Sequence, residues 1–356
     1  MLPLKSERRA VTAAEPRLGV VLVNWNRWAD TIECLESLLR STLPVRVVVV
    51  DNGSSDGSAD RIVEWATGDR PLAPVSEAMA VFSTPTLPKP LTLRRLSADE
   101  ATTAVPDAAA VTLIDAGGNL GFGGGNNIGI KFLLRAAAID YVWLLNNDTV
   151  VEPEAAAALL ARMSATHNIG MCGTVIRFYH HPETVQVLNG SRFSLVTGQS
   201  RGIGAGQAAT VPFDPARVAR ETDFVLGASL GVSRAFVATI GPMTEDYFLY
   251  FEEIDWAYRN NGRFAIAFAH GAIVFHKEGG SIGSSSAKGQ RSATSDYYLM
   301  RSRLAFVRRR APWLLPFHWL LAIAQIARRL LRLQPKKALV LLRALLGLRL
   351  DKVSRG

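Results

Sequence analysis

The stretch Tyr141–Thr149 constrains the fold of this chain more than any other part of the sequence. Its first five residues are apolar or aromatic, which is typical of a buried strand in a parallel sheet. The strand ends at Asn146–Asn147–Asp148, and an alanine-rich helix begins shortly after Pro153. A carboxylate at the carboxyl end of such a strand lies where open α/β sheets bind ligands. For Asp148 taken alone, a helix cap is the structural alternative.

The same order of strand and helix occurs twice earlier in the chain. Leu18–Asn24 and Val45–Asp51 are continuous apolar runs, and each is followed by an amphipathic helical segment. Successive units of this kind predict a parallel sheet with right-handed crossovers. Asp51 ends its strand as Asp148 does, so we expect the two acids to share one crevice.

A glycine-rich segment follows a third apolar run, Val111–Asp115. Seven of the 13 residues in Gly117–Gly129 are glycine, and a helix is expected from about 126 to 138. Glycine permits close backbone approach, and the free N–H groups of a helix start attract phosphate. The segment lacks both the lysine of a Walker A loop and the spacing of the dinucleotide fingerprint. A flexible turn is the alternative.

Two segments depart from the alternation of strands and helices. Residues 68–108 contain six prolines and scattered charges, which predict a long surface insertion. Residues 169–178 predict another strand, and residues 185–230 have the pattern of antiparallel strands joined by polar turns. This change predicts a substrate-specific half built on the same sheet.

The densest group of carboxylates lies at residues 245–255, where five acids occur within 11 residues among aromatic side chains. No Lys or Arg occurs between Arg234 and Arg259. Carboxylates crowded among apolar rings without basic partners have raised pKa values, which suits proton transfer near neutral pH. Alternatively, Glu252 and Glu253 begin a helix and interact with its dipole, and both interpretations are compatible.

His276 ends an apolar strand beside glycines, a position where histidine is most often a satisfied polar residue. It is a candidate metal ligand because Asp148 alone gives a cation too few ligands.

The formal net charge of +9 is distributed unevenly. Residues 301–356 carry +13 and residues 1–300 carry −4, so nucleic acid is not an expected partner of the predicted site. The 17 uncharged residues from Ala311 to Ala327 are at the lower limit for a membrane span, and two prolines disfavour spanning. Basic residues alternating with Leu, Trp and Phe predict helices in the interface of an anionic membrane. An amphipathic helix packed on the protein body is the alternative.

Two further features bear on the compartment. Residues 1–9 lack the apolar core of a signal peptide, so export is not expected. Cys34 and Cys172 form neither a disulfide framework nor a metal motif, which favours a reducing compartment.

Five motifs occur in one order along the chain. They are Val47–Ser58, Gly118–Asn127, Leu144–Thr149, Phe248–Asp255 and Val274–His276. Together they resemble the bacterial rhamnosyltransferase branch of glycosyltransferase family 2, inverting enzymes with the GT-A fold. The resemblance implies an α/β class with a Rossmann-like, mostly parallel central sheet flanked by helices. Residues 1–310 would form this domain, and residues 311–356 a basic amphipathic helical tail that associates with membranes.

The resemblance also implies roles for individual residues. Asp51 would contact the base or ribose of a nucleotide-sugar, and Asp148 with His276 would hold Mg²⁺ or Mn²⁺ against its diphosphate. Glu253 would be the general base, and Glu252 is the alternative for that role. The metal-binding motif of the family often has two acids; here Asp148 is the acid, and Asn146 and Asn147 fill the other places. The other predicted donor-binding residues are Asn24, Asn119, Gly121, Asn126 and Asn147.

The function implied is that of an inverting, metal-dependent hexosyltransferase. It would move L-rhamnose from dTDP-L-rhamnose to a hydroxyl of a glycan acceptor of the cell wall or linked to a lipid such as polyprenyl diphosphate. The expected location is the cytoplasmic face of the cell membrane, as a peripheral or monotopic protein. The alternatives are a galactofuranosyl or other deoxysugar transferase of the same fold, a dinucleotide-dependent oxidoreductase, and an inactive membrane scaffold.

Overall fold

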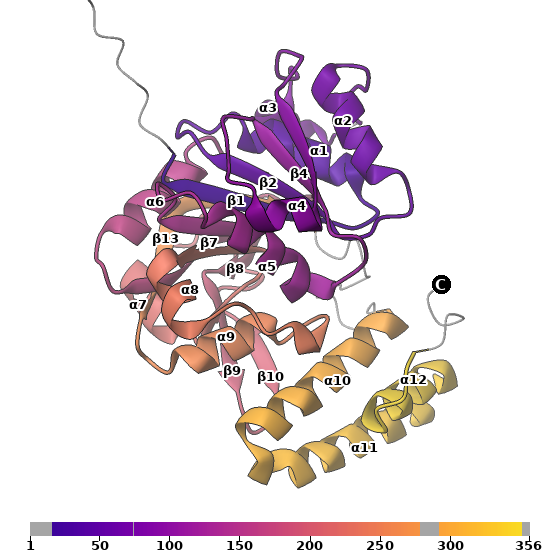
Figure 1. Cartoon of the computed structure of the whole chain (residues 1–356). Coiled ribbons are helices and arrows are strands. Elements are labelled where there is room, and N and C mark those ends of the chain that lie inside the picture. The colour runs from indigo at the N-terminus through magenta and orange to yellow at the C-terminus, as the bar shows by residue number, and fades with distance from the viewer. Residues whose placement is uncertain (1–15, 74, 278–291, 351–356) are drawn as a thin grey trace, which may run out of the picture.

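The computed structural model describes residues 16–73, 75–277 and 292–350. The predicted absence of a signal peptide concerns residues 1–9, which lie outside this part. The described residues form a central sheet of ten strands in the order β3-β4-β2-β1-β5-β12-β7-β13-β6, with β8 paired to β7 (Figure 1). Its strands are β1 (Leu18–Asn24), β2 (Arg46–Asp51), β3 (Leu93–Ser97), β4 (Val111–Asp115), β5 (Tyr141–Asn146), β6 (Thr149–Val151), β7 (Ile169–Phe178), β8 (Val185–Leu188), β12 (Ser229–Ser233) and β13 (Ala265–His276).

Most of this sheet is parallel, as the alternation of strands and helices predicts. Strands β3, β4, β2, β1 and β5 run in one direction, and β7 and β13 also pair in parallel. Strand β12 is antiparallel to β5 and β7, and the short β6 is antiparallel to β13. A smaller sheet of three antiparallel strands lies beside it, formed by β9 (Gly190–Ser194), β10 (Gln199–Gly202) and β11 (Phe224–Val225).

Helices cover both faces of the central sheet, which explains the continuous valine run of β2. Val47 and Val49 belong to the apolar core under α1 (Trp28–Leu38), α2 (Ser58–Thr67) and α6 (Ala155–Ser164). Val48 and Val50 point to the opposite core, under α4 (Ala98–Thr103), α5 (Gly121–Leu133), α8 (Arg234–Ile240) and α9 (Glu252–Asn260). A strand buried on both faces requires apolar residues at every position.

The glycine-rich segment is a helix over most of its length, because α5 begins at Gly121 and not near 126 as predicted. The glycines allow this helix to lie directly on β1. A β-carbon at Gly129 would come within 2.5 Å of Val21, and one at Gly125 within 2.8 Å of Val23. The low helix propensity of glycine concealed this element, whose position is set by packing.

Residues 68–108, predicted as a surface insertion, contribute a strand to the central sheet. Between the short helices α3 (Glu77–Ser83) and α4, strand β3 pairs in parallel with β4 at the sheet edge. An edge strand is half exposed, so its sequence, Leu-Arg-Arg-Leu-Ser, lacks the apolar run of a central strand.

The region 185–230 does contain the predicted antiparallel strands. It also contains a helix that the prediction lacked, α7 (Pro215–Glu221), which begins at an Asp214 cap followed by proline.

Three C-terminal helices, α10 (Ala293–Arg310), α11 (Leu315–Leu331) and α12 (Pro335–Leu345), pack on one another beside the smaller sheet (Figure 1). A 3₁₀ turn, Pro312–Leu314, joins the first two. Among the described residues, one helical segment, Pro312–Leu331, is long and apolar enough to cross a membrane on length and composition alone.

Candidate active site

The carboxyl ends of β1, β2 and β5 bring the predicted donor-binding residues together. Asn24 Nδ2 donates to Asp51 Oδ1 at 2.7 Å, and Thr31 Oγ1 donates to Asn24 Oδ1 at 2.8 Å. Asn147 Nδ2 donates to the same threonine oxygen at 2.9 Å. These side chains are almost fully buried, so the network fixes Asp51 and the residue preceding Asp148 at one edge of the sheet.

Two members of this network were not predicted from the sequence. Thr31 lies on α1 and bridges Asn24 to Asn147. Ser54 donates to Asp51 Oδ1 at 2.6 Å from the loop after β2. Ser54 belongs to the motif quoted for Asp51, whereas nothing in the sequence singles out Thr31.

Asn52 connects the end of β2 to the glycine-rich segment, and it too was missed. Its amide group donates to Asn119 Oδ1 at 3.2 Å and to the Gly121 carbonyl at 3.1 Å, and its Oδ1 accepts from the Leu120 amide at 3.0 Å. Asn119 and Gly121 therefore border the same crevice as Asp51.

Asn126 does not join this network. Its side chain donates to the Phe122 carbonyl one turn earlier in α5, at 2.9 Å. Its neighbour Asn127 makes the longer connection, donating to the Met243 carbonyl at 2.9 Å and to Glu245 Oε1 at 2.8 Å. The structure thus connects Asn127, not Asn126, to the acidic segment.

Asp148 and His276 face each other at the ends of β5 and β13, as predicted. His276 Nε2 lies 3.2 Å from Asp148 Oδ1, and Nδ1 lies 2.9 Å from Gln186 Oε1. Burial of Asp148 opposes its ionisation, but the interactions with His276 and the charge of Lys277 outweigh burial and lower its pKa. Asn146 Nδ2 lies 3.3 Å from the same Nε2, so the imidazole is held between the Asn146 amide, the Asp148 carboxylate and Gln186.

A metal at this position would take two ligands from the protein. No group of three His, Cys, Asp or Glu side chains suited to a metal occurs in the described part of the chain. One carboxylate and one imidazole fit a divalent ion that takes its other ligands from a diphosphate and water, as Mg²⁺ commonly does.

Glu253 lies next to this crevice through its contact with the loop before β12. Its carboxylate packs against Gly227, where a β-carbon would come within 2.4 Å of Oε1. The next residue, Ala228, accepts a hydrogen bond of 3.0 Å from the amide of Asn146 at the end of β5. The half-buried Glu253 is thereby held beside the strand end that leads into Asp148.

Glu252 has a different environment. It is 1% exposed, and neither carboxylate oxygen has a hydrogen-bond partner among the described residues. Burial and the charge of Glu253 raise the pKa of Glu252 well above its ordinary value. Burial also raises the pKa of Glu253, against the opposing effect of hydrogen bonds from its own backbone amide and that of Gly227. The pair therefore holds a proton more tightly than exposed glutamates do.

Asp255, also in this cluster, does not have the raised pKa that was predicted. Asp255 is fully buried, but Thr244, Arg259 and Arg310 all donate to it at 2.6 to 3.1 Å. Burial opposes its ionisation, yet the arginines and hydrogen bonds lower its pKa. The prediction failed because Arg259 pairs with Asp255 from one turn later in α9, and because Arg310 comes from α10, which is distant in sequence.

The aromatic segment before α9 has an unusual backbone that α10 supports. Phe248, Tyr250 and Phe251 have φ values of 64°, 66° and 73°. Non-glycine residues in this region cost free energy and persist only where surrounding contacts fix them. Ser302 Oγ donates to the carbonyl oxygens of Tyr247 and Leu249 at 3.0 and 2.8 Å, and the Tyr250 hydroxyl lies 2.6 Å from Ser295 Oγ.

Comparison with known proteins finds similarities that include part of this crevice. Residues 19–76 match the model of glycosyl transferase family 2. This segment extends from β1 through α2 and includes Asn24, Asp51 and Ser54. Over 151 residues the chain is 27% identical to the low-salt glycan biosynthesis hexosyltransferase Agl10 of Haloferax volcanii. That alignment covers 41% of this chain and 45% of the relative, so the chain spans less than half of the relative's length.

Solved structures give more distant likenesses. One is a mannosyltransferase from Pyrobaculum calidifontis in complex with GDP-Man and Mn²⁺, which is 14% identical in sequence to this chain. The alignment covers 93% of this chain and 86% of that chain, with a TM-score of 0.49. Glucosyl-3-phosphoglycerate synthase from Mycobacterium tuberculosis, in complex with Mn²⁺, UDP-Glc and phosphoglyceric acid, has 14% identity, coverage of 83% and 80%, and a TM-score of 0.42. At these TM-scores, neither likeness assigns a function to this chain. The family match and the hexosyltransferase support a glycosyltransferase, and the rhamnosyltransferase branch stays a prediction.

Proposed function

We propose that this protein is an inverting, metal-dependent glycosyltransferase that uses a nucleotide-sugar. The observation that carries the proposal is the position of Glu253, against Gly227 and beside the strand end that leads into Asp148. A single displacement at an anomeric carbon requires a base for the attacking hydroxyl and a site that binds the leaving diphosphate. Glu253 and the Asp148 end of the crevice would provide these two parts.

The donor would lie along the ends of β1, β2 and β5. Asp51, fixed by Asn24 and Ser54, would bind the base or ribose, and the Asn52–Asn119 contact would border the same pocket. Asp148 and His276 would hold Mg²⁺ or Mn²⁺, which neutralises charge on the leaving diphosphate when bound.

Glu253 would accept the proton of the acceptor hydroxyl as that oxygen attacks the sugar. Its raised pKa makes it a stronger base than an exposed carboxylate, and its partial exposure lets an acceptor reach it. The buried Glu252 is less accessible to an acceptor, which favours Glu253 for this role.

We further propose dTDP-L-rhamnose as the donor and a lipid-linked or cell-wall glycan as the acceptor, on the motif resemblance. Screening nucleotide-sugars for thermal stabilisation, with and without Mn²⁺, tests the donor, because ligands that bind the native state raise its apparent stability. Stabilisation by dTDP-L-rhamnose that requires the metal, followed by sugar transfer, is the expected result. Stabilisation by a UDP-sugar and by no dTDP-sugar would contradict this donor, and NAD binding without nucleotide-sugar binding would contradict the function.

A peripheral or monotopic position on the cytoplasmic face of the membrane is the last part of the proposal. Of the 18 exposed large apolar side chains in the described residues, 12 lie between Trp313 and Leu348. They include Trp313, 71% exposed, and Leu331, 85% exposed, on helices that also carry arginine and lysine. Apolar and basic side chains on one group of helices suit an anionic membrane surface.

A further inference from the structure

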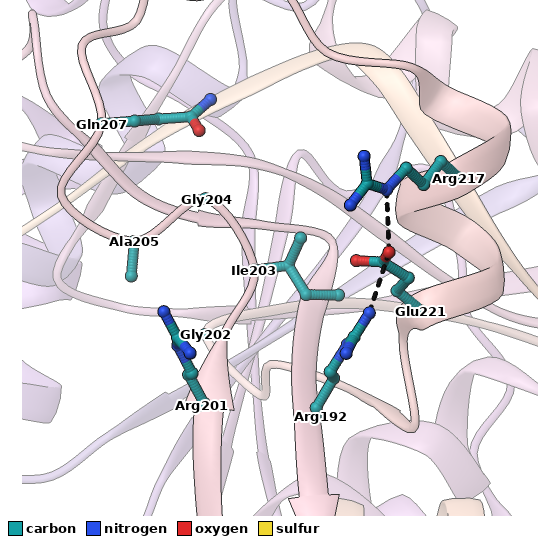
Figure 2. A pocket seen from close by; sticks show the side chains of 9 residues that line it. All are labelled: Arg192, Arg201, Gly202, Ile203, Gly204, Ala205, Gln207, Arg217 and Glu221. Carbon is teal, nitrogen blue, oxygen red and sulfur yellow. Dashed lines mark hydrogen bonds and ion pairs between the residues drawn. The ribbon is translucent and has the colours of Figure 1, made fainter.

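A cavity lies between the β9–β10 hairpin and helix α7, on the smaller sheet. It has a volume of about 410 Å³, within the range of small-ligand sites. Its lining includes three arginines and a single acid, Glu221, so positive charge is in excess by two (Figure 2). The residues lining it are Arg192, Arg201, Gly202, Ile203, Gly204, Ala205, Gln207, Arg217 and Glu221.

Two of these arginines occupy directly opposed positions in the hairpin. Arg201 of β10 pairs in register with Arg192 of β9, and like charges at opposed positions destabilise a sheet. Figure 2 shows both side chains extending from their strands toward the cavity. Glu221 Oε1 accepts from both Arg192 and Arg217 at 2.8 Å. The exposed side chain of Arg201 forms no ion pair or hydrogen bond with another described residue, so no acid there compensates its charge.

Gln207 lines the cavity and has an unpaired neutral donor. Its Nε2 is buried and has no hydrogen-bond partner within the described part of the chain. A buried donor without a partner costs free energy, and rotation of this side chain toward an oxygen-rich ligand in the cavity would satisfy it. Guanidinium groups and an amide N–H together form a donor set that matches the oxygens of a phosphate.

The cavity is connected to the crevice through strand β8. Val185 N donates to the Gln207 carbonyl at 2.9 Å, and Gly206 N donates to the Val185 carbonyl at 2.8 Å. The next residue of that strand, Gln186, holds His276 by the hydrogen bond to Nδ1. The short strand β8 therefore contacts the loop that lines the cavity and also contains Gln186, the hydrogen-bond partner of the proposed metal ligand His276.

We propose that this cavity binds a phosphate or diphosphate group carried by the acceptor. The inference rests on the proposed function, in which the donor's own diphosphate is assigned to the Asp148 end of the crevice. The ligand would be an anion with several oxygens. Three features favour this: the excess of two positive charges, the uncompensated Arg201 and the unpaired Gln207 amide. The binding itself can be measured without transfer activity.

Calorimetric titration with inorganic diphosphate, in EDTA and at constant ionic strength, tests the cavity. Arg201→Gln removes the uncompensated guanidinium and should weaken binding about tenfold. Arg220→Gln removes the same charge from α7 outside the cavity lining and should leave the affinity within about twofold. Asp148→Ala, which alters the donor end, should also leave it unchanged. Arg201→Lys keeps the positive charge but removes the two parallel N–H donors of the guanidinium group, so it should give an intermediate affinity.

Four outcomes would overturn the proposal. Absence of measurable diphosphate binding, or equal weakening by Arg201→Gln and Arg220→Gln, would leave no built anion site. Loss of binding in Asp148→Ala would place the ligand at the donor end. Cosedimentation with vesicles of phosphatidylcholine and phosphatidic acid separates a lipid surface from a free phosphate. If Arg201→Gln reduces vesicle binding but not diphosphate binding, Arg201 contributes to non-specific electrostatic binding to a membrane and not to a phosphate site. Failure of the proposed glycosyl transfer would appear separately, as an absence of stabilisation by any nucleotide-sugar.

Discussion

The carboxylate of Glu253 lies against the backbone of Gly227 so closely that a β-carbon at position 227 would come within 2.4 Å of Oε1. The residue after Gly227, Ala228, accepts a hydrogen bond from the backbone amide of Asn146, two residues before the predicted metal ligand Asp148. The position of the proposed base thus depends on a residue that has no side chain.

Replacing Gly227 by alanine should therefore displace Glu253. We expect a loss of stability of about 1–3 kcal/mol from overpacking and a fall in turnover of about 10²-fold from the misplaced base. Gly271→Ala is the matched control, because a β-carbon there meets only Ala158 at 3.5 Å. Steady-state kinetics and thermal denaturation of both variants measure the effect. Full turnover of Gly227→Ala would separate Glu253 from the chemistry.

Glu253→Gln should lower turnover by about 10²–10⁴-fold while the affinity for the donor changes little, because glutamine cannot accept the hydroxyl proton. Glu252→Gln should affect turnover less, since Glu252 is 1% exposed. Single-turnover rates and donor titrations distinguish the two variants. The reverse order of effects would assign the base to Glu252.

Glu252 should also make stability depend on pH. Its folded-state pKa is raised above the ordinary value of 4.5. As pH rises above about 4.5, the unfolded chain ionises at this position while the folded state keeps its proton, so the stability of the folded state falls. Glu252→Gln lacks this ionisation. The unfolding free energy of the variant relative to the natural chain should therefore increase with pH, by at most about 1.4 kcal/mol per unit. Denaturant titrations from about pH 5 to 8 measure the slope, with the exposed Glu77→Gln as control. A parallel pH dependence in all three proteins would show that Glu252 ionises normally.

Asp148→Ala should abolish turnover and leave the fold intact. The side chain lies at a strand end, and the Asp148 carbonyl keeps its hydrogen bond from the Lys277 amide. His276→Ala should have a smaller effect and raise the Mn²⁺ concentration needed for half-maximal turnover. Asp115→Asn, at the end of β4 outside the Asp51–Asp148 network, is the control. Activity of Asp148→Ala at ordinary metal concentrations would remove the residue from the mechanism.

Trp313→Gln combined with Trp319→Gln should weaken binding to anionic vesicles, because both indoles are at least half exposed on the C-terminal helices. Val211→Gln removes an exposed apolar side chain from another surface and should not. High salt should release much of the natural protein, since attraction to anionic lipid is about 1 kcal/mol per basic residue and is screened. Resistance to salt and carbonate, with protease protection of the C-terminus, would indicate a membrane span.

The sequence predicted the fold well where periodicity and burial agree. The strands ending at Asn24, Asp51 and Asn146 are continuous apolar runs, and their polar ends do meet in one network. Strand β3 and helix α5 were missed or misplaced because neither shows its pattern locally. The first is a half-exposed edge, and the second is set by contacts of its glycines with Val21 and Val23.

The positions of the candidate site residues could be predicted only where each lies at the end of a strand or helix; their roles stay predictions. Asp148, His276 and the glutamate pair occupy strand or helix ends, so their proximity to the crevice followed from topology. One partner of Asp255, Arg310, comes from an element distant in sequence, and so do the partners of Asn52. Thr31, which bridges Asn24 to Asn147, is likewise distant from Asn147. Such pairings depend on tertiary packing and have no local signal.

Helix α10 contacts the segment around the proposed base at three levels, through Ser295 near its start, Ser302 in its middle and Arg310 at its end. The same helix packs against the exposed apolar helices α11 and α12. If those helices rest on a bilayer, Glu253 is held at a constant height above it. The protein would then select acceptor hydroxyls by their distance from the lipid anchor. Hydroxyls nearer to the bilayer or farther from it would not reach Glu253.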